Sequence, residues 1–75
     1  MNIVIYTKSN CPNCVTAKAL LKAKGVEYME IESMPDTLEM LRTHPEARQM
    51  PQIFINGQRV GGLAGLQAAL KQVGL

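Results

Sequence analysis

Two cysteines stand in the segment Asn2-Ile-Val-Ile-Tyr-Thr-Lys-Ser-Asn-Cys-Pro-Asn-Cys14, where the pattern of the chain changes. The run Asn2–Tyr6 is short and β-branched, which predicts a buried strand. From Cys11 the pattern is helical, and Pro12 suits a first helical turn because its missing N–H costs little there. We therefore predict a strand that leads through a polar loop into a helix, with both cysteines at the start of that helix.

Periodicity predicts the next two elements. Gly25 ends the first helix, and Val26–Ile31 alternates in the manner of a second strand. A second helix is expected to begin at a Ser33 cap and to end at His44-Pro45, because the residue before a proline avoids the helical region. The expected apolar face of this second helix consists of Met34, Leu38 and Leu41.

A hairpin and a last helix are predicted for the rest of the chain. Asn56-Gly57 is a strong signal for a two-residue turn, which joins a strand over Gln52–Asn56 to a shorter strand over Gln58–Val60. Gly61-Gly62 interrupts the pattern before the last helix. The apolar stripe of that helix consists of Leu63, Leu66, Leu70 and Val73.

The predicted order of elements is β-α-β-α-β-β-α, in one domain that spans residues 1–75. A helix between two strands normally makes a right-handed crossover between parallel neighbours, while a hairpin supplies an antiparallel pair. The fold class is therefore α/β, with a four-stranded mixed sheet flanked by three helices.

Charge and hydropathy exclude several classes of partner. The formal net charge of +2 is too small to indicate nucleic-acid binding or a polybasic membrane surface. No apolar run approaches the roughly 20 residues of a membrane-spanning helix, and Met1–Tyr6 shows no basic leader. We therefore expect a cytoplasmic protein with no nucleic-acid and no membrane partner.

Cys11 and Cys14 are the two cysteines of the chain, and they form one Cys-x-x-Cys motif. A disulfide between them closes too small a loop to stabilise the fold appreciably, so redox chemistry or metal binding is favoured. A helix N-terminus favours a thiolate, and Lys8 adds a cation three residues before Cys11. We expect Cys11 to be the exposed attacking thiol and Cys14 to resolve the mixed disulfide that it forms.

Metal binding and inert buried thiols are the alternatives for these cysteines. Structural zinc takes four ligands, and the chain has only two cysteines and one histidine. A metal would therefore need two chains, as in a dimer that carries an iron–sulfur cluster. We predict no metal site within one chain, and we expect a monomer.

Three motifs, taken together, resemble the glutaredoxin family: Cys11-Pro-Asn-Cys14, Met50-Pro-Gln-Ile-Phe-Ile-Asn-Gly57 and Gly61-Gly62. The resemblance covers nearly the whole chain and implies a thioredoxin-like fold. It also implies reduction of protein disulfides and glutathione mixed disulfides, with glutathione as co-substrate and no tightly bound cofactor. The alternative is a hydrogen donor of similar length and fold that thioredoxin reductase reduces, for example a donor to ribonucleotide reductase.

The same resemblance implies a binding groove beside Cys11. Met50-Pro51 is expected to be a cis bond, with backbone groups of Met50 that bind a peptide as an added strand. Backbone N–H groups of Gly62 and Leu63 are expected to hold the γ-glutamyl carboxylate of glutathione. The full set of expected binding residues is Lys8, Pro12, Arg48, Met50, Pro51, Gln52, Gly61, Gly62 and Leu63.

The chain departs from the family at two places. Leu63-Ala64-Gly65 stands where glutaredoxins commonly have a polar or acidic pair after the two glycines, and Asn13 stands where an aromatic residue is common. The missing acidic pair favours the hydrogen donor, whereas Pro12 and Gly61-Gly62 favour glutathione. Binding of glutathione at this end then depends on backbone donors.

Overall fold

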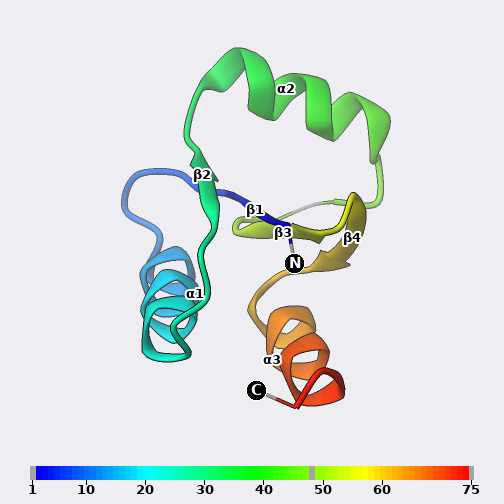
Figure 1. Ribbon diagram of the computed structural model, residues 1–75. Helices are drawn as coiled ribbons and strands as arrows, with labels where there is room; N and C mark the ends of the chain where they lie inside the picture. Colours follow the sequence, from blue (N-terminus) through cyan, green and yellow to red (C-terminus); the bar gives the residue numbers. More distant parts are fainter. Residues whose placement is uncertain (1, 48, 75) are drawn as a thin grey trace.

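The computed structural model describes residues 2–47 and 49–74. It contains a four-stranded mixed sheet and three helices, so the predicted fold class is confirmed (Figure 1). The elements in chain order are β1 (Ile3–Tyr6), α1 (Pro12–Ala23), β2 (Met29–Ile31), α2 (Met34–Thr43), β3 (Gln52–Ile55), β4 (Gln58–Gly61) and α3 (Leu63–Gln72).

The pairing of the strands determines where the cysteines lie. The strands are ordered β2-β1-β3-β4, with β1 parallel to β2 and antiparallel to β3. Tyr6, the last residue of β1, is opposite Gln52, the first residue of β3. This register brings the loop that leads into α1 beside the Met50-Pro51 segment that leads into β3.

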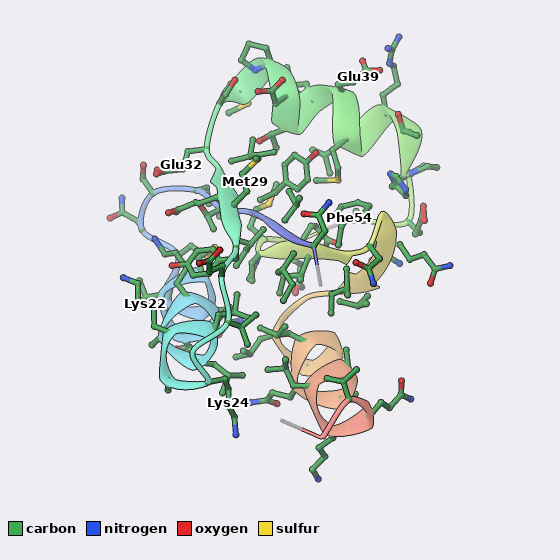
Figure 2. All side chains as sticks on the ribbon, in the orientation of Figure 1. Lys22, Lys24, Met29, Glu32, Glu39 and Phe54 are labelled. Atoms are coloured by element: carbon green, nitrogen blue, oxygen red, sulfur yellow. A yellow bond between two sulfur atoms is a disulfide. The ribbon has the colours of Figure 1, made fainter. Side chains whose placement is uncertain are left out.

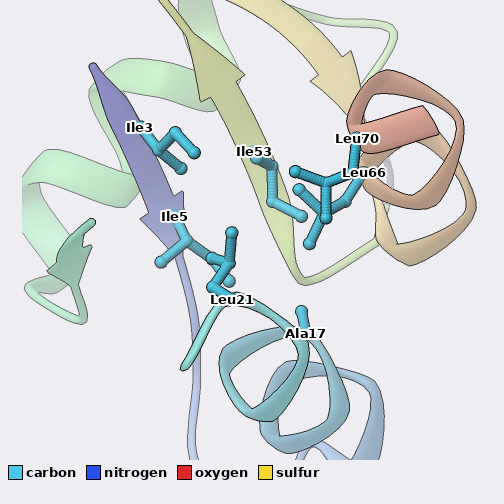
Figure 3. Packing of buried hydrophobic residues seen from close by; sticks show 7 residues of the cluster. All are labelled: Ile3, Ile5, Ala17, Leu21, Ile53, Leu66 and Leu70. Atoms are coloured by element: carbon cyan, nitrogen blue, oxygen red, sulfur yellow. The ribbon is translucent and has the colours of Figure 1, made fainter. Parts of the chain in front are cut away.

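The two faces of the sheet are covered differently. Helices α1 and α3 lie on one face and α2 lies on the other (Figure 1). The larger core cluster fills the space beneath α1 and α3, and consists of Ile3, Ile5, Ala17, Leu21, Ile53, Leu66 and Leu70 (Figure 3). A smaller cluster of Met40, Ala47 and Phe54 lies on the α2 side, where Figure 2 shows Phe54.

The apolar face predicted for α2 is wrong. Met34 and Leu38 are 62% and 57% exposed, whereas Thr37 and Met40 are buried and Leu41 is half-buried. The buried side of the helix is therefore the one that carries Thr37 and Met40, and of the three predicted residues only Leu41 packs against the smaller cluster. Met34 and Leu38 therefore remain exposed apolar side chains on α2.

Several element boundaries differ from the prediction by one to three residues. Strand β2 begins only at Met29, because the N–H of Val26 bonds the carbonyl of Leu21 in the turn that ends α1. Val73 is 55% exposed, because α3 ends at Gln72 and the apolar stripe does not continue beyond it.

Candidate active site

The two cysteines lie at the N-terminus of α1, as the sequence predicts. Cys11 is the N-cap, with extended backbone angles, and its sulfur accepts the N–H of Cys14 at 3.2 Å. The structure holds the pair as a disulfide, with the two Cα atoms 5.2 Å apart. A thiolate at Cys11 would therefore receive both a backbone hydrogen bond and the partial positive charge of the helix.

The exposure predicted for Cys11 is wrong for this oxidised form. Cys11 is 8% exposed and Cys14 is 2% exposed, so both are buried. The cover over Cys11 includes the carbonyl oxygen of Met50, which lies 3.7 Å from the Cys11 sulfur. Cys11 is still the more accessible of the pair, which agrees with its assignment as the sulfur that an outside thiol attacks.

The motif that begins with Met50-Pro51 and the Gly61-Gly62 motif contact each other at Pro51. The Met50–Pro51 peptide bond is cis, and Pro51 is buried. Gly62 packs so closely that a Cβ on it would lie 3.3 Å from the carbonyl oxygen of Pro51. The start of α3 and the cis-proline segment are therefore in direct contact.

A surface depression of about 360 Å³ opens beside Cys11. It brings together three of the predicted site residues, Lys8, Pro12 and Met50. It also includes Asn10 and Gln49, which the sequence analysis missed. Asn10 has a positive φ of 55°, a conformation that Asn tolerates better than most residues. An asparagine directly before Cys11 is therefore the sequence signal for this turn.

Other predicted residues lie elsewhere. Gln52 is buried, its amide donates to the carbonyl of Gln49 at 2.6 Å, and its oxygen accepts from Arg59 at 3.0 Å. Its side chain thus stabilises the segment before β3. Gly61, Gly62 and Leu63 are half-buried at the β4–α3 junction. Arg48 lies outside the described residues.

Comparison with known proteins agrees with this geometry. The sequence profile described as Glutaredoxin matches residues 3–60. Glutaredoxin 3 of Escherichia coli K12 is 41% identical over 76 residues, which cover 99% of this chain and 92% of the relative. This chain belongs to the glutaredoxin family. As a glutaredoxin with its Cys-x-x-Cys pair at disulfide distance, it is a thiol–disulfide oxidoreductase.

This glutaredoxin is similar to two solved structures whose descriptions differ. The buckwheat glutaredoxin–glutathione complex superposes with a TM-score of 0.78 at 26% identity, over 95% of this chain and 69% of the other. The NrdH-redoxin of Escherichia coli, described as a glutaredoxin-like protein with a thioredoxin-like activity profile, gives a TM-score of 0.75 at 25% identity. The match covers 91% of this chain and 93% of the other. Among the described residues, no helix is both long and apolar enough to cross a membrane.

A polar network lies beside the active-site loop of this glutaredoxin, which consists of residues 7–10 between β1 and Cys11. The Glu30 carboxylate on β2 accepts the Lys18 ammonium at 2.8 Å and the Thr7 hydroxyl at 2.7 Å. Both hydrogen bonds favour the ionised carboxylate, Lys18 most strongly, so they lower the pKa of Glu30. The same contact with Glu30 raises the pKa of Lys18. The network joins the end of β1, the middle of α1 and the edge strand β2.

Glu30→Gln is expected to make the Tm depend less on pH in the acid range. Because the folded-state pKa of Glu30 is lowered, its stabilisation is present above its unfolded pKa of about 4.3 and is lost as pH falls through the folded-state value. The difference in Tm between wild type and Glu30→Gln should therefore be largest near neutral pH and should narrow in acid. Thermal unfolding at several pH values measures this. Glu27→Gln, at an exposed site, is the control, and equal slopes for all three proteins would contradict the assignment.

Proposed function

We propose that this glutaredoxin is a glutathione-dependent reductase of protein disulfides and glutathione mixed disulfides. The observation that supports this most strongly is that the three motifs lie against one another in a row that begins at the Cys11 sulfur. Cys11 caps α1, the Met50 carbonyl lies 3.7 Å from its sulfur, and Pro51 contacts the Gly62 turn. The buckwheat relative, whose structure is a glutathione complex, has the same overall fold.

The reaction proceeds by two thiol–disulfide exchanges. A glutathione thiolate attacks the Cys11 sulfur, so that a Cys11–glutathione disulfide forms and Cys14 leaves as a thiolate. A second glutathione thiolate attacks the glutathione sulfur, which releases glutathione disulfide and leaves Cys11 as a thiolate. The Cys11 thiolate of the reduced protein then attacks a substrate disulfide and forms a mixed disulfide. The Cys14 thiolate attacks the Cys11 sulfur of this mixed disulfide, which releases the substrate thiolate and forms the Cys11–Cys14 disulfide again.

Glutathione would lie in the depression beside Cys11. Its cysteine would pair with backbone groups of Met50 in the manner of an added strand. Lys8, exposed at the rim of the depression, would hold the glycine carboxylate. The γ-glutamyl carboxylate would accept N–H groups from the first turn of α3, where no side chain within the described residues caps the helix.

A hydrogen donor reduced by thioredoxin reductase, with ribonucleotide reductase as a candidate acceptor, is the second candidate. The start of α3 favours it, because Ala64 and Gly65 carry no group that can pair with the ammonium of the γ-glutamyl residue. The likeness to the NrdH-redoxin also supports this candidate. A recycling assay with each reductase in turn separates the two proposals, since only one of them needs glutathione.

Ala64→Asp is expected to improve the use of glutathione. Ala64 is exposed in the first turn of α3, where a carboxylate is favoured by the helix and would lie near the γ-glutamyl ammonium. The KM for glutathione should fall roughly five-fold, the size of one weak charge-assisted contact, with little change in kcat. Steady-state kinetics with a glutathionylated peptide measures this.

Gln67→Asp is the matched control, because it adds the same charge at an exposed position about one turn further along α3. If both substitutions lower the KM equally, the effect is one of net charge. The proposed position of glutathione is then wrong.

A further inference from the structure

Lys18 lies along the same surface depression as the two cysteines. A shallow hollow of about 530 Å³ is lined by Lys18 together with Lys8, Asn10, Cys11, Pro12, Cys14 and Val15. Lys18 follows Cys14 by four residues on α1, so both side chains lie on one face of the helix. Residues four apart on a helix have Cβ atoms roughly 5–6 Å apart, so Lys18 is the neighbour of the resolving cysteine on the next turn.

The position of this cation is held from two further elements. Glu30 on β2 binds the Lys18 ammonium at 2.8 Å, and the half-buried pair has side chains 29% and 26% exposed. Glu30 is itself held by the hydroxyl of Thr7, which is 3% exposed. The N–H of Thr7 bonds the Ile31 carbonyl, which ties the start of the active-site loop to β2. Lys8, in contrast, is exposed on the loop.

The chemistry places a charge on Cys14 at a buried position. When a thiolate attacks Cys11, its electron pair forms the new S–S bond, and the electron pair of the Cys11–Cys14 bond leaves on the Cys14 sulfur. That sulfur belongs to a residue only 2% exposed, where an unpaired anion is costly. Cys14 is the third residue of α1, so the helix N-terminus still acts on it, but its own N–H is directed at the Cys11 sulfur.

We propose that the Lys18 ammonium stabilises the Cys14 thiolate, and that Glu30 is a positioning residue that holds Lys18 for this task. The inference rests on thiol–disulfide exchange at Cys11 and Cys14, and it does not depend on glutathione. In the forward step Lys18 stabilises the leaving thiolate. In the return step the same thiolate attacks the Cys11 sulfur of a mixed disulfide and expels the substrate thiolate.

Other charged groups surround the pair. Glu32 and Tyr28, which flank β2, contribute to raising the pKa of Lys18 through their charges. The charge of Lys22, on the next turn of α1, contributes to lowering the pKa of Glu30. Lys8 reaches the same hollow from the loop. Lys22 and Lys8 remain in every variant below, so the experiment isolates the charge at Lys18.

The test is the pKa of the Cys14 thiol in a Cys11→Ser background, followed by the ultraviolet absorbance of the thiolate. Lys18→Gln should raise this pKa by roughly one unit, the lower end of the effect of a nearby opposite charge. Lys18→Arg, which keeps the charge, should restore it. Lys24→Gln is the control, because Figure 2 shows Lys24 at the far end of α1, and it should leave the pKa unchanged.

A charge-swapped protein, Lys18→Glu with Glu30→Lys, separates charge from structure and serves where Lys18→Gln does not fold. It restores an ion pair but places a carboxylate on α1, so the Cys14 pKa should rise at least as far as in Lys18→Gln. An unchanged Cys14 pKa in Lys18→Gln and in the charge-swapped protein would overturn the inference, and so would an equal rise of this pKa in Lys24→Gln. The assay contains no glutathione, so the measured Cys14 pKa tests this inference even if the protein does not use glutathione.

Discussion

Cys11→Ser abolishes disulfide reduction, with turnover expected to fall to the uncatalysed rate. The serine hydroxyl is not ionised near neutral pH, so the nucleophile at the N-cap of α1 is lost while the fold and the groove remain. The measurement is reduction of a glutathionylated peptide and of a protein disulfide by the purified variant. Full activity in this variant would show that the attacking sulfur has been assigned wrongly.

Cys14→Ser provides the matched comparison, since it removes the other sulfur of the same disulfide. It should retain activity on glutathionylated peptides, because an external thiol resolves the mixed disulfide, and it should lose most activity on protein disulfides. A Cys14→Ser protein that is inactive on both substrates while Cys11→Ser is active on either would reverse the two roles.

Gly65→Ala is expected to lower the stability of the fold strongly. A Cβ at this position would lie 1.8 Å from the carbonyl oxygen and 2.8 Å from the carbonyl carbon of Val60. Both atoms belong to backbone in β4, so α3 must move away from the sheet and from its contacts at Leu66. Overpacking of this kind costs on the order of 2–3 kcal/mol, which lowers the Tm of so small a domain by roughly 10–20 °C.

Thermal unfolding followed by circular dichroism measures this effect. Gln67→Ala, at an exposed position on the same helix, should change the Tm by no more than roughly 2–3 °C. If Gly65→Ala is as stable as Gln67→Ala, α3 is not held against β4 in the way described. The close contact leaves no room for a side chain at residue 65 in this structure.

The element order and the position of the cysteines were predictable because they depend on local signals. The β-branched run before a polar loop, Pro12 in the first helical turn and Asn56-Gly57 each act within a few residues. The face of α2 was not predictable in this way. Met34 and Leu38 have helical spacing, but which side of a helix is buried depends on the sheet beneath it, and here Thr37 and Met40 fill that space.

The parts of the site that escaped sequence analysis are contacts between distant residues. Lys18 and Glu30 are 12 residues apart, and Thr7 and Glu30 are 23 residues apart. Each of these side chains has an ordinary surface character on its own, so no local pattern marks the network. Gln52 is the converse case, because it was expected among the binding residues as an aid to holding the glycine carboxylate of glutathione, whereas its hydrogen bonds are made to Gln49 and Arg59.

The most direct test of the proposed function is a recycling assay on the oxidised protein with a disulfide substrate, followed by consumption of NADPH. One reaction contains glutathione and glutathione reductase, and the other contains thioredoxin reductase. We expect turnover with glutathione, which would mean that the backbone donors of α3 suffice without an acidic pair. Turnover with thioredoxin reductase alone would contradict glutathione dependence and assign the protein to the hydrogen donors.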